Sequence, residues 1–277
     1  MRRTALSVLL AAFALCALSG VQAKDVKLEY KFRKGEVDKY KVTMGMKMSM
    51  PGMPKGAQMP GTMIVSMTMA QKVLDVLPDG SAKIQVTMSN MKMSGPGMPQ
   101  NMGSMPARTM TVTMTKDGRT AGGGMGGMMG GMGAMPGSDP MGSMACVLPT
   151  RAVRVGETWK QAIPMPNNCG KINCVSTLLS AALPMGKTTA SKIKQSFSGR
   201  LDLGKMMGGG AGGGSGDMDL KGSSIMFFSP SQGKLLKTSS KASARMRMST
   251  PPNPQSPGAP TKMNMLMDMT IDVTKVK

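Results

Sequence analysis

Histidine is missing from the 277-residue chain, and acidic and aromatic residues are scarce. Without histidine there is no Ser-His-Asp triad, no imidazole acid or base, and no ligand of the kind most common in zinc and copper(II) sites. The 5 Phe, 2 Tyr and 1 Trp are too few for a stacking platform that binds single-stranded nucleic acid. We therefore expect a protein that is not an enzyme and does not bind nucleic acid.

Acidic residues number only 14 against 35 Lys and Arg, which gives a formal net charge of +21. Such an excess favours anionic partners, including anionic components of a cell envelope. The basic residues are scattered, however, which is also typical of the solvent side of β-strands. Asp217 and Asp219 form the most suggestive carboxylate pair, either for glycosidase chemistry or as part of a solvated strand edge.

The first 23 residues have the pattern of a secretion signal. Arg2 and Arg3 precede an apolar run at 5–18, and Val-Gln-Ala at 21–23 is a small-residue cleavage site. The run is too short to span a bilayer comfortably. We therefore expect a secreted protein, periplasmic or extracellular, with no transmembrane segment after signal cleavage.

Period-2 alternation of apolar and polar residues dominates the rest of the chain. It predicts strands at 25–33 and 38–50, and one long hairpin at 61–95. The hairpin turns at Leu77-Pro78-Asp79-Gly80, where proline presets φ and glycine accepts a positive φ. Because the apolar set changes phase in both arms near Ala70 and Met88, we expect a bend or bulge there that passes the hairpin from one packing layer to another.

The second half of the sequence repeats features of the first. Residues 33–44 (RKGEVDKYKVTM) align without gaps with residues 154–165 (RVGETWKQAIPM), and Leu-Pro-x-Gly occurs at 77–80 and again at 183–186. The shared order favours a tandem duplication. Further strands are predicted at 109–115, 175–183, 188–203, 217–228, 234–248 and 261–276, and a short helix is an option at 180–183.

These patterns predict an all-β protein of two related halves. Long antiparallel strands would form curved sheets, an open barrel or a sandwich, with long disordered loops rich in Gly, Met and Pro. The predicted divisions are a signal peptide at 1–23, a first β-rich half at 24–120, a Gly/Met-rich linker at 121–147 and a second β-rich half at 148–277.

A family resemblance rests on three features of this chain. These are an opening Lys-Gly-x-x-x-x-Tyr at 34–40, a central Leu-Pro-x-x-x-Val-x-Val-Gly-Glu-Thr-Trp at 148–159, and methionine-rich alternating strands. Together they resemble a Met-rich family of secreted bacterial proteins of unknown function with duplicated β-rich halves. The resemblance implies a secreted β-rich fold and no particular activity.

Three cysteines follow the predicted cleavage site. Cys169 and Cys174 are spaced to close a small disulfide loop in an oxidising compartment, which leaves Cys146 free or paired between chains. A soft-metal site built from the three thiolates is the alternative, although the spacing matches no standard zinc pattern.

Methionine is unusually abundant, with 37 residues. Thioether sulfur suits Cu(I) and Ag(I), and the glycine-rich loop would let several sulfurs converge on one ion. The candidate ligands in that loop are Met125, Met128, Met129, Met132 and Met135. Methionines in the strands are better explained as packing that replaces missing aromatic residues.

The function expected from these observations is that of a non-catalytic envelope or extracellular protein without a cofactor. Its predicted ligand is an apolar molecule held between the sheets. The alternative is a Cu(I)/Ag(I) binder that uses methionine thioethers.

Overall fold

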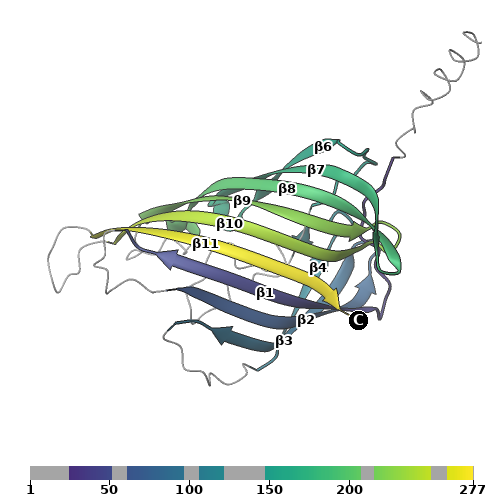
Figure 1. The fold of residues 1–277 in the computed structure, drawn as a ribbon, viewed down its shortest axis with the longest axis horizontal. Coiled ribbons are helices and arrows are strands. Elements are labelled where there is room, and N and C mark those ends of the chain that lie inside the picture. Colours follow the sequence, from purple (N-terminus) through teal and green to yellow (C-terminus); the bar gives the residue numbers. More distant parts are fainter. Residues whose placement is uncertain are drawn as a thin grey trace, which may run out of the picture.

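The computed structural model describes residues 25–51, 61–96, 106–121, 147–206, 215–250 and 261–276, and it is almost entirely β (Figure 1). The predicted all-β class is confirmed. The strands are β1 (Val37–Ser49), β2 (Thr62–Val76), β3 (Ala82–Ser94), β4 (Arg108–Met114), β5 (Thr120–Ala121), β6 (Thr158–Pro164), β7 (Gly170–Met185), β8 (Thr188–Asp202), β9 (Ser215–Ser229), β10 (Lys234–Thr250) and β11 (Thr261–Val276). Two short helices are η2 (Pro166–Asn168) and α3 (Leu203–Met206).

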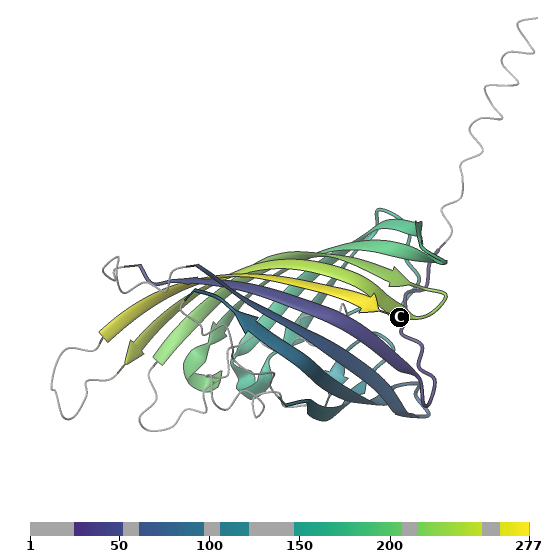
Figure 2. The same ribbon diagram turned by 60° about the horizontal axis from the view of Figure 1, so that its bottom comes forward.

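All eleven strands belong to one antiparallel sheet in the order β5-β4-β3-β2-β1-β11-β10-β9-β8-β7-β6. The first strand of the chain pairs with the last, and this ladder joins the two halves. The sheet is strongly curled (Figure 2). It is not closed, because no ladder joins its edge strands β5 and β6 within the described residues.

Side chains alternate between two faces of this sheet, which we call the inner and the outer face. On β1, Tyr40 and Val42 lie on the inner face, opposite Met69 and Met67 of β2. All four side chains are buried. The inner face holds both apolar clusters of the protein, whereas the lysines between these positions, such as Lys41, lie on the outer face.

The hairpin of β2 and β3 confirms the predicted turn. The Gly80 amide donates to the Leu77 carbonyl at 2.8 Å with φ of 79° at Gly80, and Val76 pairs with Ala82. The bulge expected near Ala70 and Met88 is present, but its consequence differs from the one expected. An irregularity beside Asn90, which has a φ of 53°, and another beside Leu74 reset the register. These bulges keep the apolar side chains on the inner face, so the predicted passage between layers is wrong.

Three other sequence expectations need correction. Residues 25–33 alternate in burial as predicted, but they form only one isolated bridge, from Val26 to Val153, and no strand. The optional helix at 180–183 is part of strand β7. Strands β5 and β6 were not predicted, because β5 has two residues and β6 has no sustained alternation of apolar and polar side chains.

The two aligned motifs, 33–44 and 154–165, fold alike at their start. Gly35 and Gly156 have φ of 81° and 86°. The Glu36 amide donates to Arg33, and the Glu157 amide donates to Arg154, each at 3.0 Å. Both turns lead into a strand, β1 or β6, that pairs with the next strand in the chain. The predicted duplication remains a prediction, and the two halves form one continuous sheet.

The two ends of the sheet, at opposite ends of its strands, differ in the segments that connect the strands. At the turn end, short turns join β2 to β3, β7 to β8 and β9 to β10, and segment 25–36 crosses over the inner face. The Tyr30 amide donates to Lys116 at 2.8 Å, and the Lys31 amide donates to Gly233 at 3.1 Å. At the far end, four of the connections lie outside the described residues. We find no helix among the described residues with the length and apolar character needed to cross a bilayer.

Two apolar clusters fill the inner face. The turn-end cluster includes Leu28, Val42 and Phe228 with residues of nearly every strand. The far-end cluster is smaller and includes Leu201, Met218 and their neighbours on β8 to β11. The described residues therefore have their main core at the turn end.

Candidate ligand-binding site on the inner face

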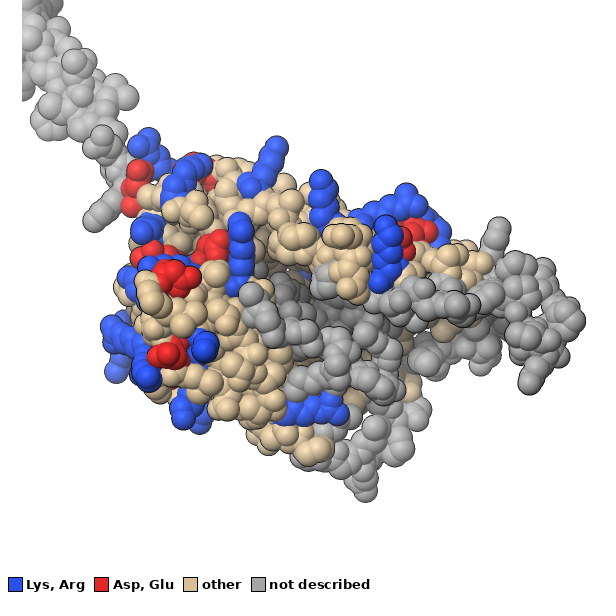
Figure 3. Space-filling model, turned by 180° about the vertical axis from the view of Figure 1, so that it is seen from behind, with Lys and Arg blue, Asp and Glu red and all other residues tan. Residues whose placement is uncertain are grey.

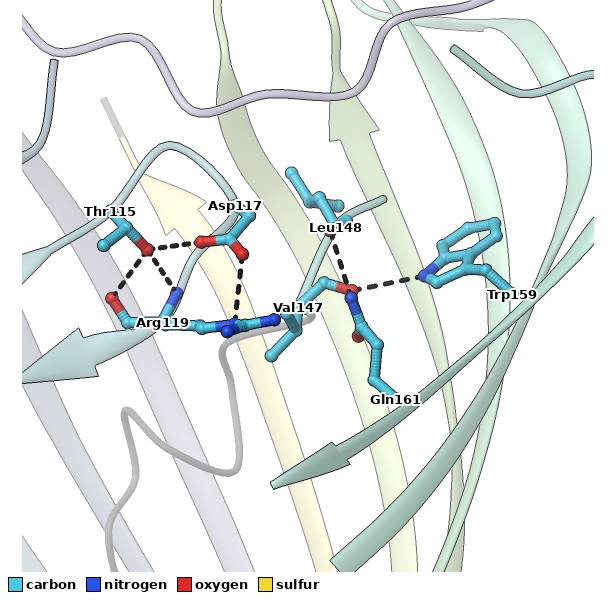
Figure 4. Close-up of polar contacts among 7 residues, drawn as sticks. All are labelled: Thr115, Asp117, Arg119, Val147, Leu148, Trp159 and Gln161. Atoms are coloured by element: carbon cyan, nitrogen blue, oxygen red, sulfur yellow. Dashed lines mark hydrogen bonds and ion pairs between the residues drawn. The ribbon is translucent and has the colours of Figure 1, made fainter. Parts of the chain in front are cut away.

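The edges of the curled sheet are bridged at the turn end by residues 147 and 148. The Leu148 amide donates to the Asp117 carbonyl at 2.8 Å, in the turn between β4 and β5. On the opposite edge, Trp159 Nε1 donates to the Val147 carbonyl at 3.3 Å, and Gln161 Nε2 donates to the Leu148 carbonyl at 3.2 Å. Figure 4 shows both β6 side chains directed at this short segment. This part of the inner face is therefore covered by backbone.

A buried ion cluster also belongs to the turn end. Lys234 is 7% exposed, and its Nζ lies 2.5 Å from carboxylate oxygens of both Glu36 and Asp38. Lys275 contacts Asp38 at 2.8 Å. Burial, followed by the charge of Asp38, raises the pKa of Tyr40 well above its ordinary value. The Lys234 ammonium is fully engaged by carboxylates, so the cluster ties β1 to β10 and β11.

A stripe of polar side chains crosses the inner face beyond this core. Ser176, Gln195, Ser224 and Ser240 face one another across β7, β8, β9 and β10, and all are buried. Gln195 Nε2 donates to Ser176 Oγ at 3.3 Å, and Ser224 Oγ donates to Gln195 Oε1 at 3.5 Å. The stripe separates the turn-end cluster from the far-end part of the face.

Small residues make the floor of the inner face directly beyond the stripe. Gly222 and Ala242 pair across β9 and β10, and both are half-buried. The Phe197 ring of β8 lies over Gly222, where an added Cβ would collide with it. We use the name trough for the far-end part of the inner face; the residues at its positions are Gly199, Gly222, Ala242, Ala244, Phe197, Ile172, Met46, Met48, Met63, Met267 and Met269.

Methionines form one side of the trough. Met63, Met46 and Met269 face one another across β2, β1 and β11, and all three are half-buried. The next inner-face position pairs Met48 with Met267. Unbranched thioether side chains adapt their shape readily, so this side can adjust to an apolar molecule of irregular form.

One polar atom at the edge of the trough lacks a partner. Gln161 lies on the same row as Cys174, Phe197 and Gly222. Its Oε1 is buried and accepts no hydrogen bond from the described residues. A buried carbonyl without a donor costs about 1–3 kcal/mol, so a bound group with an N–H or O–H would find a favourable partner here.

The charges lie away from the trough. Seen from the side opposite to Figure 1, Lys and Arg lie mainly around the outline, and most of the visible Asp and Glu lie beside them at the left (Figure 3). Asp217 and Asp219, the carboxylate pair noted in the sequence, lie on the outer face. Asp217 contacts Arg247 at 2.8 Å and Arg200 at 3.3 Å, and Asp219 contacts Arg247 at 3.2 Å. These ion pairs account for both carboxylates as parts of a surface network.

The structure does not form the predicted disulfide. Cys169 and Cys174 are both free and buried. The Asp202 amide donates to the Cys169 carbonyl, and Gly170 pairs with Leu201, so the chain is already extended at Cys169. Five extended residues span about 16 Å, whereas a disulfide needs Cα atoms within about 7 Å. Burial raises the pKa of both thiols, which makes them poor nucleophiles at neutral pH.

The predicted loop ligands, Met125 to Met135, lie outside the described residues, as do Cys146 and the predicted signal peptide. The described residues contain no group of three or more His, Cys, Asp or Glu able to hold a metal ion. The sequence patterns did not predict the trough. The available signal was the replacement of large apolar residues by Gly222 and Ala242 at inner-face positions of otherwise apolar strands.

Comparison with known proteins does not assign the chain to a family. No family model matches the chain. No curated protein matches it either. The geometry of the inner face therefore carries the functional argument.

Proposed function

We propose that this is an exported, non-catalytic envelope or extracellular protein that holds an apolar ligand in the trough. The observation that carries the proposal is the partial exposure of apolar side chains in the trough, where Met46, Met63, Met269 and Phe197 are half-buried beside small residues. The Phe197 ring already covers Gly222, so Ala242 is the small residue of this floor that a bound group would contact.

The expected ligand has a flexible apolar chain. Each methylene moved from water into an apolar site contributes about 0.8 kcal/mol, so a chain of ten carbons gains about 8 kcal/mol before ordering costs are subtracted. Methionine suits such a chain because its three rotatable bonds let the lining follow the ligand. A hydroxyl or amide at the end of the chain would donate to Gln161 Oε1, the buried acceptor without a partner.

Fluorescence of the neutral apolar probe N-phenyl-1-naphthylamine tests this proposal. We expect the purified protein to enhance its emission and dodecanol to displace it. Ala242→Leu fills the floor of the trough and should weaken probe binding by about tenfold. The matched control is Ala70→Leu, a half-buried alanine on the outer face of β2. Equal binding by both variants and the unaltered protein would contradict a site in the trough.

A second candidate function is binding of Cu(I) or Ag(I) by methionine thioethers, and the register of β2, β1 and β11 favours it. Side chains opposite each other on neighbouring strands have Cβ atoms about 4.5–5.5 Å apart. The sulfurs of Met63, Met46 and Met269 can therefore approach one another from three adjacent strands. Soft thioethers select Cu(I) over harder divalent ions.

Titration with Ag(I), which does not change oxidation state in air, tests the metal candidate. The background carries Cys146→Ala, Cys169→Ala and Cys174→Ala, because thiols would otherwise compete. We expect the triple change of Met46, Met63 and Met269 to Leu to abolish Ag(I) binding and to retain the apolar probe. The control changes Met67, Met69 and Met88 to Leu in the turn-end cluster.

A further variant distinguishes the loop from the sheet. It changes Met125, Met128, Met129, Met132 and Met135 to Leu. Loss of Ag(I) binding only in this variant would assign the metal to the loop. Absence of Ag(I) binding in the background protein would reject the metal candidate and leave the apolar ligand unaffected.

A further inference from the structure

The outer face of the sheet carries a groove, whose lining also includes Gly222, Ala242 and Met269 of the trough. It has a volume of about 610 Å³ and crosses five strands, β2, β1, β11, β10 and β9. Most of its lining side chains are polar and belong to the outer face, including Thr62, Ser223, Ser243 and Thr270. Gly45 lies in the floor, where an added Cβ would come within 2.7 Å of Thr270 Oγ1. The groove is therefore hydroxyl-rich and contains no aromatic side chain among its described lining residues.

Three lysines, Lys47, Lys221 and Lys241, surround this floor, and all three are exposed. Asp268 is the one acidic residue among the described residues that line the groove. None of the three lysines makes an ion pair within 4.0 Å with any described residue, in contrast to Arg200 and Arg247 on the same face. The groove therefore keeps uncompensated positive charge.

The strand register sets the spacing of these charges. Lys47, Asp268, Ser243 and Lys221 face one another in sequence across β1, β11, β10 and β9. Three interstrand steps separate Lys47 from Lys221, which is about 14 Å at about 4.8 Å a step. Lys241 lies on the adjacent outer-face row, beside Thr270 and Ser223. An extended chain of anionic units matches this spacing better than one small anion does.

We propose that this groove binds an acidic polysaccharide, a chain of sugar rings that carry carboxylates. Lysine ammonium groups would pair with the carboxylates, and the serine and threonine hydroxyls of the floor would exchange hydrogen bonds with the sugar hydroxyls. Single-stranded nucleic acid fits less well because the groove offers no ring for base stacking. A bilayer fits less well because its flat surface cannot enter the groove.

Binding of polygalacturonate to the purified full chain tests this proposal, with its fully methyl-esterified form as the uncharged polymer of the same backbone. We expect binding of polygalacturonate and none of the ester. Changing Lys47, Lys221 and Lys241 together to Gln should weaken binding by about tenfold or more. The matched control changes Lys160, Lys171 and Lys194 to Gln, three exposed lysines on the outer face of β6, β7 and β8.

A second variant, Ser223→Trp, fills the groove at an exposed position without changing its charge, and it should also weaken polygalacturonate binding. An equal loss in the two triple variants would overturn the proposal, because it would mean that general positive charge attracts the polymer. Tighter binding of duplex DNA or of phosphatidylglycerol vesicles than of polygalacturonate, dependent on the same three lysines, would also overturn it.

Discussion

The turn end and the far end of the same sheet differ in how their inner face is covered. At the turn end, segment 25–36 and residues 147–153 cover the inner face with backbone hydrogen bonds, and Lys234 is buried between two carboxylates. At the far end, Met46, Met63 and Phe197 remain half-buried around small residues. Within the described residues, the inner face is therefore covered by backbone at the turn end, whereas part of its apolar surface stays half-exposed at the far end.

The largest effect should come from breaking the buried ion cluster of the turn end. Lys234→Met leaves Glu36 without its cation and Asp38 with only Lys275, so we expect a loss of about 3–5 kcal/mol in the free energy of unfolding. Urea denaturation measures it. The control is Lys237→Met, an exposed lysine on the same strand. Similar midpoints for the two variants would remove the ion cluster from the explanation of stability.

Equivalent methionine truncations at the two ends sharpen the comparison. Met67 is 5% exposed in the turn-end cluster, and Met67→Ala should cost about 2–4 kcal/mol. Met46 is half-buried in the trough, and Met46→Ala should cost about 1 kcal/mol because the cavity it leaves is open to solvent. Urea denaturation of both variants provides the measurement. A larger cost at Met46 would show that the trough is part of the rigid core.

Paired glycine substitutions test whether the two similar turns are energetically alike. Gly35 and Gly156 have positive φ, and an added Cβ would meet no atom within 4 Å at either position. Gly35→Ala and Gly156→Ala should therefore each cost about 1–2 kcal/mol through backbone strain alone. Thermal unfolding of both variants, with asparagine substitutions as milder controls, checks this. A large difference between the two positions would show that the matching turns have unequal roles.

Acid should weaken the turn end slightly. Hydrogen bonds from the Ser81 hydroxyl and amide lower the pKa of Asp79, and hydrogen bonds from the Arg154 amide and the Arg151 side chain lower the pKa of Glu157. Both carboxylates stabilise the fold above their unfolded-state pKa, and this contribution is lost as pH falls below about 4 through the folded value. Melting temperatures between pH 6 and 2.5 should fall less steeply in the Asp79→Asn, Glu157→Gln double variant. Parallel curves would contradict this.

Much of the fold followed from local sequence. Alternation placed β1, β8 and β11 within a few residues of their observed bounds, and Pro78 with Gly80 located the hairpin turn. The pairing of β1 with β11 could not be predicted, because alternation specifies which face is buried and not which strand is the neighbour. For the same reason, segment 25–33 alternates without joining the sheet.

The candidate site was harder to predict than the fold. The sequence drew attention to Met125–Met135 and to the Cys169–Cys174 spacing, because close spacing in sequence is easily seen. The trough instead combines Phe197, Gly222 and Met46 from strands far apart in the chain. Its prediction would have required the register of seven neighbouring strands. Similarly, no local feature of Lys47, Lys221 or Lys241 indicated that they surround one groove.

The pairing of the first strand with the last has a consequence for how the chain acquires its structure. Val42 pairs with Val273, so the centre of the sheet joins residues separated by nearly the whole sequence. Contacts of such long range make folding slow, because a large loop must close before they form. Until β11 is synthesised, β1 and β10 both present unpaired edges that can pair with other chains and aggregate. The export that we propose would avoid this hazard, because β11 would be available by the time the sheet assembles.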